Sequence, residues 1–322
     1  MEQRSDYGLA IPTALNFSLA AGHVFINLYQ FFVLPIYLLP ISSWWALTLL
    51  PVAALSNPFW SLIHESIHDM FHPASRINLA AGRALSVLFG SSFRVLRISH
   101  LMHHKFNRTP MEGTEFYDPA KRSRVEASLG YYFQILGGLY FFEVVGALPF
   151  FLPRGLLRKA VRRFLGGNTL GGILFKSLMG DEAIREMRAD GAAILALLGL
   201  SAFCYGAHWQ LLLGALLVRA FLISFMDNVY HYRTPVDGIF YANNLWLPQP
   251  VSACLLYFNI HGIHHRYPTL PWIKLPEKLA EESGRFAGNY FAAAVRQLQG
   301  PVPLSELPRW SDVAIAPAQN IL

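Results

Sequence analysis

Cysteine and charged residues are both scarce in this 322-residue chain. Its only two cysteines, Cys204 and Cys254, lie in apolar surroundings, so they provide neither a disulfide framework nor the thiolates of an iron–sulfur cluster. Charged residues make up 14% of the chain, whereas soluble domains contain roughly 25%. Apolar residues reach 53%, and the mean hydropathy is +0.33. The composition therefore predicts an integral membrane protein.

The few charges that are present are mostly basic. The net charge is +6 and the isoelectric point is near 9.3. Such a balance favours anionic lipid, an acidic protein or nucleic acid as a partner. In a membrane protein nucleic acid is the least expected of these, and we expect none.

Histidine is the residue that stands out. Eight of the twelve histidines lie in three short clusters, HESIH at 64–68, HLMHH at 100–104 and HGIHH at 261–265. Within each cluster the spacings are three or four residues, which places the side chains on one face of a helix. This regularity predicts imidazoles that converge on metal, and the candidate ligands are His64, His68, His100, His103, His104, His261, His264 and His265.

Eight imidazoles are more than one ion can hold, because a zinc ion takes about four ligands and a catalytic zinc takes only three from protein. Two ions that share eight or nine imidazoles would receive four or five each, with positions left for water or oxygen. A nitrogen-rich site of this kind suits iron and the activation of oxygen.

The hydropathy pattern predicts an all-α membrane fold in a single domain covering 1–322. About 20 apolar residues cross a bilayer, and four spans are expected, at about 13–41, 44–63, 191–207 and 210–228. The first span is read as uncleaved, because it is too long for a signal-peptide core. The second span ends directly before His64.

Two further segments, at about 76–99 and 128–152, are predicted to lie at the membrane interface or to be re-entrant. If 128–152 crossed the membrane, the third cluster would emerge opposite the first two, and many basic residues would lie outside, against the positive-inside rule. The prediction is a multi-pass protein of the cell membrane with both termini and the metal site cytoplasmic. A helical cap follows the last span, and about 300–322 is expected to be a loose tail.

The residues around the clusters carry a family resemblance. The sequence HHKFNR at 103–108 with YDP at 117–119, and HHRYPTLPW at 264–272, accompany the three histidine boxes. Together they resemble the membrane fatty acid desaturase family, whose relatives are the membrane hydroxylases, over about 40–280. The resemblance implies two iron ions held by the box histidines, with O2 as co-substrate. It also implies that His231, beside Asn228, is a further ligand, with Asn228 acting through a metal-bound water or through contact with a ligand.

By this resemblance the chain would introduce a carbon–carbon double bond into a fatty acyl chain carried by acyl carrier protein, coenzyme A or membrane lipid. The sequence contains no haem-binding segment, ferredoxin-type cysteine set or dinucleotide fingerprint. Electrons would therefore come from a separate ferredoxin-, rubredoxin- or cytochrome b5-like protein.

Several alternatives remain open in the sequence. The same ligands would serve a di-iron hydroxylase of a lipid or other apolar substrate. HESIH also matches the HExxH motif of zinc proteases, in which Glu65 would be the general base, although six histidines would then have no role. A metal or haem carrier is a third class. His72 extends the first cluster by four residues, and a carboxylate of the loop that contains Glu112, Glu115 and Asp118 could orient a box histidine.

Overall fold

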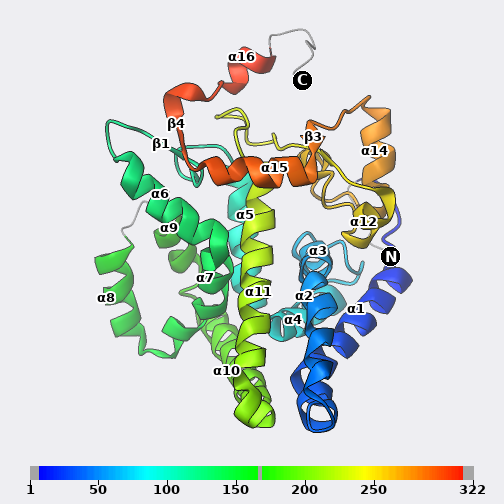
Figure 1. The fold of residues 1–322 in the computed structure, drawn as a ribbon. Coiled ribbons are helices and arrows are strands. Elements are labelled where there is room, and N and C mark those ends of the chain that lie inside the picture. The colour runs from blue at the N-terminus through cyan, green and yellow to red at the C-terminus, as the bar shows by residue number, and fades with distance from the viewer. Residues whose placement is uncertain (1–6, 166–168, 315–322) are drawn as a thin grey trace.

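Helices dominate the computed structural model of the chain, which describes residues 7–165 and 169–314. Long apolar helices form the lower part of the molecule in Figure 1, and short helices and loops form a cap at the top. The described strands are only two residues long and form two separate parallel pairs, β1 (Phe116–Tyr117) with β4 (Val302–Pro303) and β2 (Leu245–Trp246) with β3 (Gly288–Asn289).

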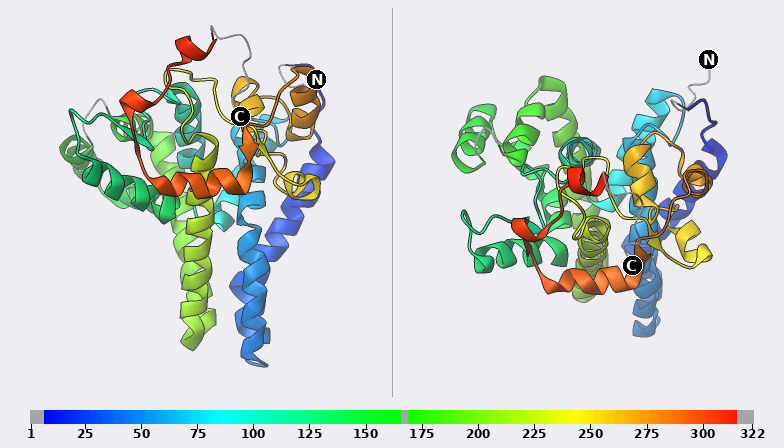
Figure 2. Two further views of the ribbon diagram at one scale, coloured as in Figure 1. Left: turned by 45° about the horizontal axis from the view of Figure 1, so that its top comes forward. Right: turned by 90° about the horizontal axis from the view of Figure 1, so that it is seen from above.

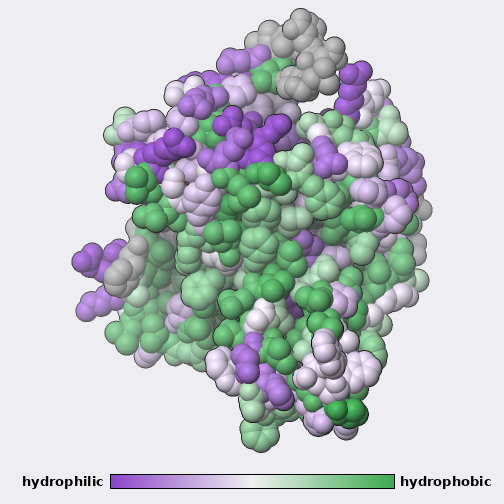
Figure 3. Space-filling view, viewed as in Figure 1, coloured by the Kyte–Doolittle hydropathy of each residue, from purple (hydrophilic) through white to green (hydrophobic). Residues whose placement is uncertain are grey.

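Two helical hairpins form the lower bundle. The helices of the first are α1 (Thr13–Leu28), η1 (Tyr29–Leu38), η2 (Ser43–Thr48), α2 (Leu49–Ala54) and α3 (Ser56–Ile67). The second consists of α10 (Asp181–Tyr205), η5 (Gly206–His208) and α11 (Trp209–Asp227). Apolar side chains gather over this part of the surface, whereas hydrophilic ones gather over the cap (Figure 3).

Four helical stretches of the described chain are long and apolar enough to cross a membrane, namely 13–38, 43–67, 124–151 and 181–230. The predicted fold class, a helical membrane protein with four candidate spans, is confirmed. The four predicted spans and these four stretches are not the same set. The stretch 181–230 contains both arms of the α10–α11 hairpin, which were predicted as two spans. The stretch 124–151 covers most of the segment 128–152, which was predicted to be interfacial or re-entrant. Which of these stretches cross the bilayer stays a prediction.

The stretch 124–151 is not a straight helix. Its helices are α6 (Arg124–Phe133), η3 (Gln134–Gly138), α7 (Leu139–Val145) and η4 (Leu148–Phe151). Ser123 and Glu126 form a capping box that begins α6. Gly137 breaks the helix with a φ of 139°, a conformation that glycine adopts at little cost.

The segment 76–99 is not a single helix. It contains α4 (Ser75–Phe89) and α5 (Phe93–Phe106), which are bent by 101° relative to each other. Gly90 ends α4 in the left-handed region with a φ of 98°, as a glycine C-cap commonly does.

A buried arginine fixes this corner between α4 and α5. Arg219, in the middle of α11, is 3% exposed. Its guanidinium donates to the carbonyl oxygens of Leu88 and Phe89 at 3.4 and 3.2 Å and to Oδ1 of Asn27 at 3.0 Å. The Tyr140 hydroxyl also donates to the Phe89 carbonyl. These donors satisfy carbonyls that a helix end would otherwise leave unpaired inside the bundle.

The remaining helices flank the bundle or form the cap. Beside the bundle lie α8 (Arg154–Phe164) and α9 (Leu170–Ser177). The cap contains η6 (Asn228–Tyr230), α12 (Gln249–Cys254), α13 (His261–Arg266), η7 (Trp272–Lys274), α14 (Leu275–Glu281), α15 (Tyr290–Arg296), η8 (Gln297–Gln299), η9 (Leu304–Glu306) and α16 (Trp310–Ala314). Figure 2 shows α15 beside the upper end of α11, where it contacts η6.

The C-terminal segment was predicted to be a loose tail from about residue 300, and for 300–314 the structure corrects this. Strand β4 pairs with β1, and Val302 and Leu307 are buried against Phe116 and Tyr131. Hydrophobic periodicity is weak here because the contacts come from single residues, not from a helical face. Residues 315–322 lie outside the described part of the chain.

Chemical labelling tests the predicted topology. In a chain with Cys204→Ala and Cys254→Ala, we expect Arg162→Cys on exposed α8 to react with a membrane-impermeant maleimide only after the cells are permeabilised. Its matched control is His208→Cys in the exposed η5 turn, which should react in intact cells. Labelling of Arg162→Cys from outside would mean that 128–152 crosses the membrane.

Candidate metal centre

Four segments bring nine histidines together where the bundle meets the cap. His64 lies in the last turn of α3, and His68 is the residue that ends this helix. Helix α5 carries the second cluster and α13 carries the third. His231 follows η6, directly after α11.

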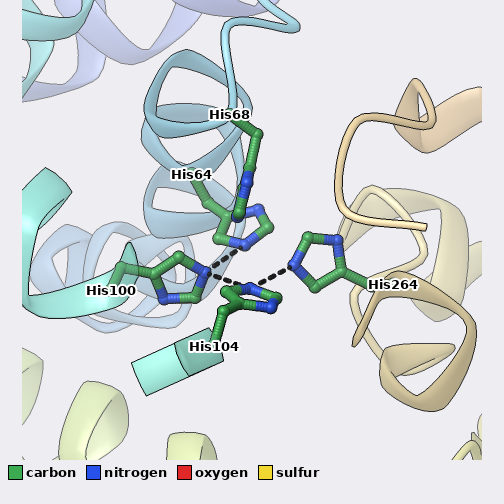
Figure 4. A group of neighbouring side chains, drawn as sticks. All are labelled: His64, His68, His100, His104 and His264. Carbon is green, nitrogen blue, oxygen red and sulfur yellow. Dashed lines mark hydrogen bonds between the residues drawn. The ribbon is translucent and has the colours of Figure 1, made fainter. Parts of the chain in front are cut away.

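The first group has five histidines whose potential ligand atoms lie within 4.8 Å of one another, namely His64, His68, His100, His104 and His264. Figure 4 shows their rings pointing toward a common centre from three helices. The Nε2 atom of His100 lies 2.9 Å from that of His64 and 3.0 Å from that of His104, and the Nε2 atoms of His104 and His264 are 3.1 Å apart. The Nε2 atom of His68 is buried without a hydrogen-bond partner among the described residues.

The second group contains His103, His231, His261 and His265, whose potential ligand atoms meet the same limit. The Nε2 atom of His265 lies 3.2 Å from that of His103 and 3.1 Å from that of His261. His231 is 7% exposed, and its Nδ1 has no hydrogen-bond partner in the described part of the chain. The two groups adjoin, because the rings of His104 and His265 stack with centroids 4.4 Å apart.

The boxes on α5 and α13 each contribute to both groups. On α5, His100 and His104 lie in the first group and His103 in the second; on α13, His261 and His265 lie in the second group and His264 in the first. Residues four apart point about 40° from each other on a helix, whereas adjacent residues differ by about 100°. The expectation that all three histidines of a box project one way is therefore replaced by a division between two neighbouring sites.

All nine predicted ligands lie in these two groups, whereas the remaining three histidines lie elsewhere. His72 accepts a hydrogen bond from the backbone of Ala74 at its Nδ1. His23 stacks on Phe59 within the bundle, and His208 is exposed in η5. The Asn228 amide donates to Gln297 at 3.0 Å and to Tyr131 at 3.4 Å, so its contact with a metal through water stays a prediction.

The geometry of both groups fits metal ions. Neighbouring ligands that are each about 2.1 Å from one ion lie roughly 3 Å apart, as the repeated Nε2–Nε2 distances of 2.9 to 3.2 Å do. Burial and then the neighbouring imidazoles lower the pKa of His261, His264 and His265 well below its ordinary value. The rings are therefore neutral, which is the form that binds metal.

A loop carboxylate orients one of these rings. Oε1 of Glu112 lies 2.7 Å from Nδ1 of His103. Although burial by itself lowers the pKa of His103, the Glu112 carboxylate raises it overall. Carboxylates that bind the outer nitrogen of a ligand histidine fix its tautomer and orientation. Asp118 instead accepts a hydrogen bond from the Ala120 backbone nitrogen.

Arg108, which the sequence analysis did not single out, ties the second box to the segment after His231. It is 2% exposed and forms an ion pair with Glu115. Its guanidinium also donates to the carbonyl oxygen of Thr234 at 2.5 Å and to that of Pro235 at 3.2 Å. The sequence gives no signal of its burial, because the loop that receives its guanidinium lies more than 120 residues away.

The position of Glu65 does not support the zinc-protease interpretation. A protease base must reach a metal-bound water. Instead, Oε2 of Glu65 accepts a hydrogen bond from the Trp272 backbone nitrogen at 3.3 Å. Oε1 of Glu65 lies on the Nδ1 side of His64, at 3.9 Å, whereas Nε2 of His64 faces the other histidines.

Two cavities flank the broken helix 124–151. One, of about 700 Å³, reaches His100, His103 and His231 and extends along apolar residues of α7 and α9. The other, of about 1000 Å³, lies between α6, α7, α10 and α11 and does not reach the histidines. Of these two cavities, only the first reaches the histidines.

Comparison with protein families identifies the relationship. The family model described as "Fatty acid desaturase" matches residues 42–293, which is most of the chain and includes all nine histidines. A search of the curated proteins finds no match.

A glycine inside the third box provides a test of the geometry. A Cβ at Gly262 would lie 2.4 Å from the carbonyl oxygen of Ala242, which is part of the backbone and cannot turn away. We expect Gly262→Ala to displace α13 and to reduce bound metal, measured per chain on purified protein. The matched control is Gly199→Ala on α10, where a Cβ has open space. Equal metal content in both variants would contradict the close packing of α13.

Proposed function

Because the chain belongs to the fatty acid desaturase family, we propose that it is an oxygen-dependent di-iron enzyme that introduces a double bond into a fatty acyl chain. The family relationship supports a membrane oxidoreductase that acts on fatty acids. The observation that carries the finer proposal is the division of nine imidazoles into groups of five and four beside one largely apolar cavity.

The histidines would hold two irons, one in each group. When bound and reduced, the irons supply the chemistry that lets O2 oxidise an unactivated C–H bond. In the overall reaction the substrate loses two hydrogens, and O2 takes up these two hydrogens together with two electrons and two protons from the donor side, so that two waters form. Imidazole ligands suit iron, and groups of five and four imidazoles would leave coordination positions for water or O2.

The protein would bind the acyl chain in the cavity that reaches the histidines. Its volume of about 700 Å³ is within the usual range of small-molecule sites. Leu139, Phe142, Leu174 and Phe175 are among the residues that line it. These apolar walls would exclude water and hold one region of the chain against His100 and His103 while the remainder lies between the helices.

Electrons would reach the centre from a separate ferredoxin-, rubredoxin- or cytochrome b5-like protein on the cytoplasmic side. Lys105 directly follows His104 in the sequence, Arg233 lies two residues after His231, and both are exposed. Exposed positive charge close to the metal centre would favour an acidic donor. Acyl carrier protein, coenzyme A and membrane lipid are the proposed carriers of the acyl chain.

Lipid analysis of a host that expresses the chain tests the reaction. We expect acyl chains with a new double bond, and we expect the product to disappear in His104→Ala, which still inserts because the bundle does not depend on the metal. A hydroxylated product would favour a hydroxylase, which uses the same ligands. Purified protein should contain about two irons per chain; a single zinc would contradict the proposal.

The role of His231 can be tested separately from the boxes. Its loss would leave three imidazoles in the second group, so His231→Ala should remove one iron of the two and abolish product formation. His208→Ala, in an exposed turn at the far end of α11, is the matched control and should change neither quantity. Full iron content and activity in His231→Ala would mean that eight ligands are sufficient.

A further inference from the structure

The larger of the two cavities, of about 1000 Å³, takes no part in the proposed reaction. It lies on the opposite face of the broken helix 124–151 from the cavity that reaches the histidines. Leu136 and Phe141 line the larger cavity, whereas Leu139 lines the smaller one. Its described lining contains no histidine. A molecule bound in it is therefore distinct from the acyl chain that would react at the metal centre.

Apolar side chains form most of the walls of this cavity. On α11, Leu213, Leu217 and Ala220 lie on one face of the helix and line about 10 Å of its length. This helix belongs to a candidate membrane span, and half of the hydrocarbon core of a bilayer is about 15 Å thick. Water gains no hydrogen bonds from apolar walls. A hydrocarbon chain is therefore the occupant that suits this part of the cavity.

The available polar side chains of the cavity lie together at one end. Arg124 and Ser128 line it at the start of α6, one helical turn apart on the same face. Arg124 is exposed and has no ion-pair partner within 7–165 and 169–314. Helix α6 begins at the level of the cap and descends toward the bundle (Figure 1). The cavity thus presents a free cation at the polar surface and apolar walls below it.

The other polar side chains of the lining already have partners. The hydroxyl of Tyr132 donates to the carbonyl oxygen of Leu298 at 2.8 Å, and that of Tyr140 donates to the carbonyl oxygen of Phe89. Arg219 donates to backbone carbonyls at the end of α4 and to a side-chain amide. Of the two arginines in the described lining, only Arg124 is therefore available to a ligand, and this lining contains no carboxylate.

We infer that this cavity binds an anionic phospholipid, with the headgroup phosphate at Arg124 and one acyl chain between α6 and α11. Phosphate oxygens are strong acceptors for a guanidinium group, and the hydroxyl of Ser128 provides a further donor. A zwitterionic headgroup fits less well, because no lining carboxylate pairs with its ammonium group. Val125, Leu129 and Phe133 are more than half exposed along the same side of α6. They provide an apolar surface for a second acyl chain, which a free fatty acid lacks.

Native mass spectrometry of the purified, delipidated protein in a neutral detergent tests the headgroup contact. We expect one phosphatidylglycerol to bind more tightly than phosphatidylcholine. Arg124→Gln should weaken binding of phosphatidylglycerol by about 5-fold, the contribution of one basic residue near an anionic headgroup, and should leave phosphatidylcholine unaffected. The matched control is Arg122→Gln, an exposed residue of the same loop outside the cavity lining, which should change neither affinity.

Filling the cavity tests the acyl-chain contact separately. Leu217→Trp places a larger side chain among the lining residues and should weaken binding of both phospholipids. Val218→Trp, at the adjacent exposed position outside the lining, is its control and should weaken neither. Melting curves without added lipid show that each variant is folded. Equal affinities for the two phospholipids, equal effects of Arg122→Gln and Arg124→Gln, or tighter binding of oleate than of phosphatidylglycerol would each overturn the inference.

Discussion

The structure depends on bringing nine imidazole rings from four separate segments to two adjacent points. The rings are buried or half-buried, and their Nε2 atoms face one another at about 3 Å. Such an arrangement is unfavourable unless a cation or shared protons occupy the centre, so metal binding and the local fold are coupled. Buried hydrogen bonds of polar side chains hold the segments that carry these rings in place.

Polar anchors inside apolar surroundings position the ligand segments. Arg219 and Gly90 set the corner from which α5 rises, and Arg108 joins the end of α5 to the loop that follows His231. Asn244 accepts a hydrogen bond from the first turn of α13 at Ile263. Each anchor satisfies backbone groups that would otherwise be buried without partners, which makes these contacts specific as well as stabilising.

The broken helix 124–151 lies between two cavities. One of its faces lines the cavity that reaches the histidines, and the other lines the larger cavity between α10 and α11. Its kink at Gly137 lets a single apolar segment form both walls.

Composition and hydropathy determined the membrane class, histidine spacing determined the candidate metal ligands, and the boxes with their neighbouring motifs carried the family resemblance, because all of these depend on local sequence. They could not decide how the ligands divide. His103 and His264 each join a group drawn mainly from other helices, and this depends on the angles at which α3, α5 and α13 meet. Arg219 is an ionisable residue within an apolar segment, which is a signal that the sequence contains. The sequence does not show which groups it binds, the carbonyls at the end of α4. The order of 300–314 and the burial of Arg108 likewise follow from contacts between residues far apart in the chain, which only the tertiary structure determines.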